Sequence, residues 1–241
     1  NSAWDPIVIE GCADSALNLL RRTTDCEIEL NFTTSRKGLE ALRGGKCELA
    51  GFNFPKSSSN NSKAFETFGH LLTENNRLIF FATRLQGLAV APNNPKKIYS
   101  ILDIASRKAR FINRREGTGT RILFDQILDV LAVKPEEIEG YNDISDTQFF
   151  TAVQIAAGKV DVGLCTANVA KENGLEFIPL AKEVYYLAAD QKFLETQKAK
   201  KFLQFLRSYD WSEHKEQLEG YDFNGTGEVF KVSDVFPSEG N

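Results

Sequence analysis

The chain has few histidines, no methionine and no long hydrophobic run, and these shortages argue against several classes of function. Its 241 residues include only two histidines, His70 and His214, which lie far apart and near no nucleophile motif. We therefore expect surface or capping roles for them rather than catalytic bases. The apolar run at 78–82 has the length of a buried strand, and no run approaches the length that crosses a bilayer. The sequence predicts no membrane insertion.

Cysteine is also scarce, and its positions fit neither a metal site nor a disulfide framework. Zinc sites and disulfide-rich domains show clustered spacing such as C-x-x-C. No such spacing occurs among the four cysteines, Cys12, Cys26, Cys47 and Cys165. Free thiols persist best in a reducing compartment. The sequence therefore predicts no metal and a cytoplasmic location.

The start of the sequence keeps a second location open. It begins at Asn1 without Met, and it shows no basic region followed by an apolar stretch, so no signal peptide is visible. Such a start is typical of a mature form or an excised fragment. The periplasm is therefore the alternative location.

The charge of the chain and its lack of a catalytic pattern both favour a binding module. The net charge is −4, with 26% charged and 42% hydrophobic residues, as in an ordinary globular protein. It gives no reason to expect a surface that binds nucleic acid or a membrane. Cys12 lies near Asp14, but no histidine completes a nucleophile and base. We expect neither catalytic residues nor a cofactor, and not an enzyme.

Apolar strands and amphipathic helices alternate along the chain. Strand patterns occur at 7–9, 28–32 and 47–52, and a closing helix carries Ala199, Phe202, Leu203 and Leu206 on one face. Strands that alternate with helices indicate an α/β architecture. The polar segment 56–63 predicts a loop.

A Gly/Thr turn at 117–120 joins the apolar strand at 111–114 to a helix that begins near Arg121. Glycines let a ligand approach the backbone, and the first N–H groups of a helix have no partner within the helix. Together they form an anion cradle at the positive end of the helix dipole. The alternative is an ordinary strand–turn–helix in which Thr118 caps the helix.

An internal repeat extends this pattern to a second part of the chain. Residues 33–51 align without gaps on 146–164, which places Thr34 on Thr147 and Gly45 on Gly158. The alternative is that αβ units in general begin with Thr and end in Gly. Two similar α/β lobes would bind a ligand where they face each other.

Four helix starts are then expected to face one cleft, two from each lobe. A hydrogen bond to a charged group contributes about 1.5–3 kcal/mol, so a few of them reach micromolar affinity, roughly 8 kcal/mol. Asp14 opposes an anion unless its carboxylate caps a helix. The candidate ligand-binding residues are Cys12, Asp14, Thr34, Ser35, Thr118, Gly119, Thr120, Arg121, Thr147 and Gln148.

The segments 84–95 and 113–121 resemble the periplasmic-binding-protein-like family that is described as molybdate-binding-protein-like. The resemblance implies a type II two-lobe α/β fold with a ligand cleft between the lobes. Lobe one would hold residues 1–88 plus 188–241 and lobe two residues 89–187, with crossovers near Gly87-Leu88 and Leu187-Ala188. Cys12 stands where the family often has a small hydroxyl residue.

The same resemblance implies a ligand and partners. The ligand would be a molybdate or tungstate oxyanion, and the chain would act as the sensor or effector module of a bacterial regulator. A DNA-binding domain would then belong to the full-length chain, and a homodimer is an open alternative. The other function is that of a solute-binding component of an ABC importer for an oxyanion or a small organic ligand.

Overall fold

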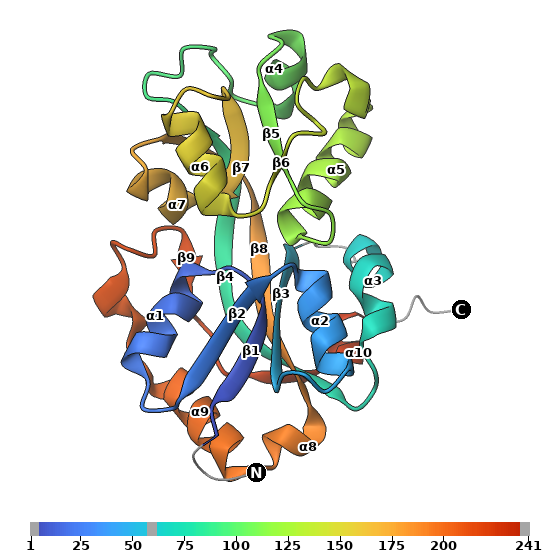
Figure 1. Ribbon diagram of the computed structural model, residues 1–241, viewed down its shortest axis with the longest axis vertical. Coiled ribbons are helices and arrows are strands. Elements are labelled where there is room, and N and C mark those ends of the chain that lie inside the picture. Colours follow the sequence, from blue (N-terminus) through green and yellow to red (C-terminus); the bar gives the residue numbers. More distant parts are fainter. Residues whose placement is uncertain (1–4, 57–61, 237–241) are drawn as a thin grey trace.

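The computed structural model describes residues 5–56 and 62–236, and they form two lobes joined by two long strands. The strands β4 (Asn76–Val90) and β8 (Glu176–Asp190) run antiparallel through both lobes (Figure 1). One strand path, β2-β1-β3-β8-β4-β7-β5-β6, therefore crosses the whole molecule. This is the α/β architecture expected from the alternation of strands and helices.

Lobe one is built on three parallel strands, β1 (Ile7–Cys12), β2 (Ile28–Thr33) and β3 (Leu49–Pro55). Its first helices are α1 (Ser15–Thr23), α2 (Ser35–Arg43) and α3 (Ser62–Phe68), followed by the short 3-10 turn η1 (Gly69–Leu71). Helices cover both faces of the sheet, and β3 is accordingly buried at every position.

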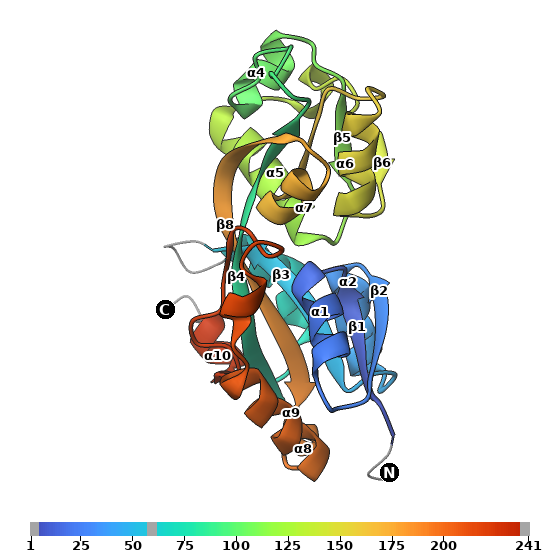
Figure 2. The same ribbon diagram turned by 90° about the vertical axis from the view of Figure 1, so that its left-hand side faces the viewer.

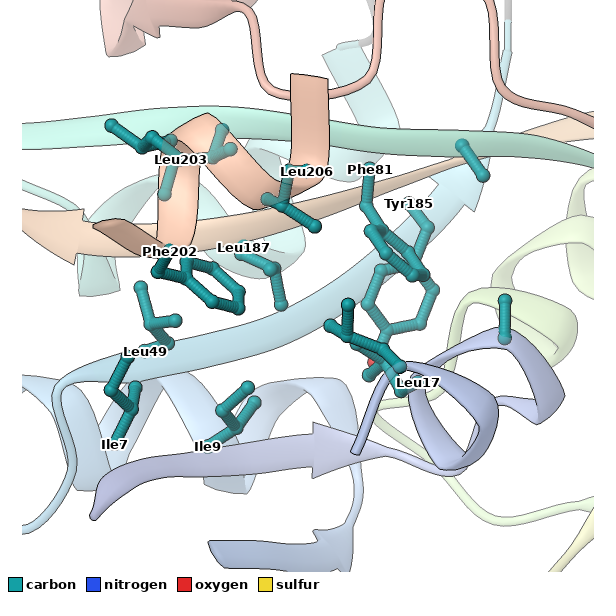
Figure 3. Close-up of a cluster of buried hydrophobic side chains, with 14 of the residues drawn as sticks. Ile7, Ile9, Leu17, Leu49, Phe81, Tyr185, Leu187, Phe202, Leu203 and Leu206 are labelled. Carbon is teal, nitrogen blue, oxygen red and sulfur yellow. The ribbon is translucent and has the colours of Figure 1, made fainter. Parts of the chain in front are cut away.

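The end of the chain returns to lobe one and packs beside the crossing strands (Figure 2). It forms α8 (Gln191–Leu194), α9 (Gln197–Ser208), η3 (Trp211–His214), β9 (Tyr221–Asp222), β10 (Val229–Lys231) and α10 (Val232–Val235). The apolar face expected at 199–206 is buried: Phe202 and Leu206 of α9 pack with Ile7, Leu49 and Leu187 (Figure 3).

Lobe two has the same layered design. Its strands are β5 (Phe111–Arg114), β6 (Ile144–Ser145) and β7 (Val162–Thr166). Its helical segments are α4 (Ile101–Ser106), α5 (Gly119–Leu131), η2 (Pro135–Glu137), α6 (Gln148–Ala156) and α7 (Ala167–Glu172). Phe111 of β5 stacks on Phe124 of α5, with ring centroids 4.4 Å apart.

The internal repeat corresponds to matching units, α2–β3 in lobe one and α6–β7 in lobe two. Thr34 and Thr147 cap the two helices. Gly45 and Gly158 follow them with φ of 66° and 67°, a left-handed conformation that glycine adopts without strain. The aligned positions therefore have the same local structure.

Two expectations concern a loop and the boundary between the lobes. Of the expected loop at 56–63, residues 57–61 lie outside the described residues, and α3 already begins at Ser62. In β8, Tyr185 and Leu187 pack in the core of lobe one. We therefore propose that lobe two ends near Ala181, several residues before the expected crossover at Leu187-Ala188. In the part of the chain that the structure describes, no helix has the length and apolarity of a membrane span.

Candidate functional site

The four predicted helix starts cap α1, α2, α5 and α6 where the lobes meet. Asp14, Thr34, Thr118 and Thr147 are the N-cap residues, and each side chain accepts a hydrogen bond from the third N–H group of its helix. The capping interpretation of Thr118 is therefore confirmed. Capping leaves the first two N–H groups of each helix without a partner inside the helix.

On one side of the junction the lobes touch. The N–H group of Arg36 in α2 donates to the carbonyl of Gly117 in lobe two, at 3.2 Å. Gly119 lies so close to Asn53 of β3 that a Cβ atom on it would overlap the Asn53 amide. Ser35 is buried, and its hydroxyl donates to Asn53 Oδ1 at 3.3 Å. The structure thus brings Thr34 and Ser35 together with Thr118 and Gly119.

On the other side the lobes enclose a cavity of about 230 Å³. Asp14 and Ser15 line it from lobe one, and Thr147, Gln148 and Phe149 line it from lobe two, together with Ala13, Asn18, Arg84, Thr166, Val169, Glu172 and Tyr221. A second hollow of about 260 Å³ shares Ser15, Asn18 and Glu172 and continues outward. The Asn168 amide of α7 donates to Ser15 Oγ at 2.9 Å and bridges the lobes beside the cavity.

Asp14 does not present a free carboxylate to this cavity. Arg84 Nη1 and the Tyr221 hydroxyl both donate to Asp14 Oδ2, at 2.7 Å each, and Oδ1 caps α1. Arg84 also donates to Glu183 Oε2 at 3.1 Å and lies over the Tyr185 ring. Burial opposes the charge of Arg84, but the neighbouring Glu183, Tyr221 and Asp14 raise its pKa well above the ordinary value.

Arg114 is the one buried cation of the junction that has no carboxylate partner among the described residues. It is 5% exposed, and its Nε and Nη2 donate to the carbonyls of Ser145 and Asp146, at 3.2 and 3.1 Å. Its Nη1 is buried without a partner within residues 5–56 and 62–236. Burial lowers the pKa of the guanidinium, which also interacts electrostatically with Cys12 and Arg84. Arg114 therefore lies at the start of α6 and faces lobe one.

The remaining predicted residues have other partners. Cys12 is buried, and its carbonyl accepts from the Tyr185 hydroxyl at 2.7 Å. Arg121 forms an ion pair with Asp125 and donates to the Tyr141 hydroxyl at 2.7 Å, so it is not among the residues that the structure gathers. Gln148 Oε1 accepts from the Thr166 N–H group at 2.8 Å. Thr120 Oγ1 accepts from Gln86 Nε2 at 2.9 Å.

Sequence reasoning missed four buried polar side chains at this junction, Arg84, Gln86, Arg114 and Glu183. Their signal is a charge or amide inside an otherwise apolar strand. Charged groups are almost never fully buried unless they are paired or functional. Arg114 lies two residues after the apolar pair Phe111-Ile112, and Arg84 and Gln86 follow the apolar run at 78–82.

Comparisons with known proteins concern the family and the fold. A model described as the PBP superfamily domain matches residues 17–207. The uncharacterized protein YvgK of Bacillus subtilis is 32% identical over 228 residues, which are 93% of this chain and 73% of that protein.

Two solved structures share the fold at low sequence identity. One, from Clostridium perfringens, is described as a phosphate ABC transporter substrate-binding protein with bound phosphate; the match covers 95% of this chain and 100% of that one, with TM-score 0.63 and 17% identity. PhnD1 of Prochlorococcus marinus, in complex with methylphosphonate, has TM-score 0.58 and 16% identity, with 97% and 96% covered. At such identities the likeness shows the fold alone.

Proposed function

Because this chain belongs to the PBP superfamily, we propose that it is a solute-binding protein whose cleft takes a small oxyanion or an organic molecule that carries one. The expected two-lobe solute-binding fold supports this proposal, and so does the convergence of helix N-termini from both lobes. The proposal is a binding function and contains no catalytic step.

The observation that carries the proposal is the unpaired Nη1 of Arg114. Glu183 interacts with Arg114 electrostatically but forms its ion pair with Arg84, and a buried charge that is not itself paired costs several kcal/mol even after relaxation of its surroundings. The guanidinium also lies at the N-terminus of α6, because its Nη2 donates to the Asp146 carbonyl, one residue before the N-cap Thr147. The guanidinium of Arg114 and the N-terminus of α6 both favour a negative charge, and they lie beside each other. An anion there would compensate Arg114 and accept from the first N–H groups of α6.

Thr147 and Gln148 at the start of α6 line the cavity, and Arg114 is buried behind this lining, at the Asp146 carbonyl. The size of the cavity favours an oxyanion with an organic substituent. A water molecule occupies about 30 Å³ of liquid, so a cavity of about 230 Å³ has room beyond a bare tetrahedral oxyanion. Phe149 and Val169 add apolar wall, and Asn18 and Glu172 add polar wall toward the outer hollow. A phosphonate or a small phosphorylated acid fits this lining better than molybdate does. The importer component is accordingly our main proposal, with a periplasmic location.

Our second proposal is the effector module of a regulator that responds to molybdate or tungstate. It would act in the cytoplasm, as a monomer or as a homodimer. The two proposals differ in the gene-encoded sequence that precedes Asn1. A secretory signal there favours the importer, and a helix-turn-helix domain favours the regulator.

A thermal-shift panel tests the ligand class. Phosphate, methylphosphonate, molybdate and tungstate would be compared with a neutral sugar. A ligand at 100 times its Kd stabilises the folded state by about 2.7 kcal/mol, which corresponds to a rise in Tm of roughly 5–10 °C at this chain length. We expect a phosphonate or phosphate to give the largest rise. A panel in which neutral solutes raise the Tm and all four oxyanions leave it unchanged would contradict the proposal.

A further inference from the structure

Three buried side chains, Glu183, Gln86 and Thr120, connect the crossing strands with the N-terminus of α5. Glu183 and Gln86 are fully buried and Thr120 is 3% exposed. Gln86 Nε2 donates to Thr120 Oγ1 at 2.9 Å. Gln86 and Glu183 are diagonal neighbours on the paired strands β4 and β8, and the Gln86 amide lowers the pKa of the Glu183 carboxyl, as a donor to the ionised form does. Nevertheless, Gln86 Oε1 and Glu183 Oε1 both lack a partner among the described residues.

A proton on Glu183 satisfies both oxygens. An ionised carboxylate and an amide oxygen can only accept hydrogen bonds, whereas a protonated carboxyl also donates one. Its O–H group can donate to Gln86 Oε1, and the amide then keeps its NH₂ group on Thr120. A hydroxyl that accepts from Gln86 retains its own proton for another acceptor. In this arrangement the hydroxyl proton of Thr120, the second residue of α5, is available to an anion that reaches the buried start of α5, behind the cavity lining.

An ionised Glu183 favours the opposite arrangement. The amide then turns its NH₂ group toward the carboxylate, and which way an amide points is set by its hydrogen-bond network. Thr120 donates to the amide oxygen and directs only lone pairs elsewhere. An anion in the cleft would meet an acceptor instead of a donor. The protonation state of Glu183 therefore decides what Thr120 offers to the ligand.

We propose that Glu183 is a positioning residue that takes up a proton when the cleft binds an anion, and that it acts through Gln86 to make Thr120 a donor to that anion. This inference rests on the proposed function, because it needs an anion in the cleft. It makes ligand binding and proton uptake two parts of one equilibrium.

The groups around Glu183 are consistent with this role. Arg84 of β4 contacts its Oε2, and Arg114 of β5 interacts with it electrostatically. Pro55, opposite Glu183 in β3, has no titratable group, and Asp14 reaches the cluster only through Arg84. Burial raises the pKa of Glu183, while Arg84, the Gln86 amide and Arg114 oppose the rise. An anion that engages Arg114 weakens this opposition, so binding favours the neutral carboxyl.

Calorimetric titration with methylphosphonate tests the inference. Binding heats in two buffers of different ionisation enthalpy give the number of protons taken up, and a pH series gives the slope of Kd. The ligand's own protonation is common to all variants and cancels in their difference. We expect the wild type to take up more protons than Glu183→Gln and to lose up to about tenfold more affinity per pH unit. Thr120→Ser should keep the wild-type values, whereas Thr120→Val should lose both affinity and the extra proton.

Glu40→Gln is the matched control, since it removes a carboxylate from an exposed ion pair with Arg36. It should keep the wild-type proton uptake. Equal proton uptake and equal pH slopes in the wild type and Glu183→Gln would overturn the inference and leave the proposed function intact. If Glu183→Gln does not fold, Gln86→Met decides in the same way, because it breaks the link to Thr120. If methylphosphonate, phosphate, molybdate and tungstate all fail to bind the wild type, the proposed function itself is wrong, and the inference with it.

Discussion

Replacing Arg114 by Gln removes the charge on which the proposed anion site depends. In the wild type, the NH₂ group at Nη1 of the guanidinium is buried without a partner among the described residues. A hydrogen bond from a charged group contributes about 1.5–3 kcal/mol, which corresponds to a loss of about 10- to 150-fold in affinity when it is removed. We expect the Kd for the oxyanion that gives the largest thermal shift to rise by this factor.

The stability of the ligand-free protein distinguishes a binding role from a structural one. Arg114→Gln loses the hydrogen bonds to the Ser145 and Asp146 carbonyls, but it also removes a buried charge whose desolvation costs several kcal/mol. Because these effects oppose each other, the Tm without ligand should change little. A purely structural arginine would behave differently: its loss would lower the Tm and leave the affinity unchanged.

The assay is isothermal titration calorimetry, combined with thermal unfolding of the free protein. The matched control is Arg115→Gln. Arg115 is the next residue and is exposed in its ion pair with Asp146, and such pairs contribute about 0–1 kcal/mol. The affinity of Arg115→Gln for the oxyanion should therefore change by less than about fivefold. Arg114→Lys keeps the charge without the planar fork and should give an intermediate Kd. Equal loss of affinity in Arg114→Gln and Arg115→Gln would refute the reasoning.

Three further predictions concern the same junction. Burial raises the folded-state pKa of Glu183 above its ordinary value of 4.5, so the folded state keeps a proton that the unfolded chain has released, and the free energy of unfolding falls as pH rises from about 4.5 through the folded-state pKa. Urea unfolding at a series of pH values should show a smaller fall in Glu183→Gln than in the wild type, and an equal fall would count against this prediction. Gly119→Ala places a methyl group against Asn53 and should hold the lobes apart. X-ray scattering with ligand present should then give a larger radius of gyration than in the wild type, and an unchanged radius would contradict this prediction. Ser15→Ala removes the hydrogen bond between the lobes that Ser15 forms with Asn168. A net contribution of about 0.5–1.5 kcal/mol for this bond predicts that ligand binding weakens by up to about tenfold. Titration calorimetry measures the Kd, and tighter binding would show that Ser15 does not help to close the lobes on the ligand.

Local chemistry explains which features the sequence could reveal. Thr34, Thr118 and Thr147 were recognisable as helix starts because an N-cap bonds only three residues along the chain. The repeat was recognisable because Gly45 and Gly158 end matching helices in the left-handed conformation. Each of these signals lies within one helix–strand unit.

Long-range pairing explains what the sequence could not reveal. The partners of Arg84 are Asp14 and Glu183, which lie 70 and 99 residues away, and no local pattern joins them. The concern that Asp14 repels an anion is answered only by this pairing. Arg121 is a different case, since its partner Asp125 is four residues along the same helix. That spacing is typical of a helical ion pair and could have removed Arg121 from the candidate site.

The most direct test of the central claim, that the junction between the lobes binds an oxyanion, is a crystal structure with arsenate or molybdate bound. Arsenic and molybdenum scatter anomalously, so their positions can be identified without reference to the rest of the map. We predict an anomalous peak between Arg114 Nη1 and the N-terminus of α6, with an oxygen atom of the anion within hydrogen-bonding distance of Thr120. A peak outside the junction, or an anion site that does not include Arg114, would contradict it.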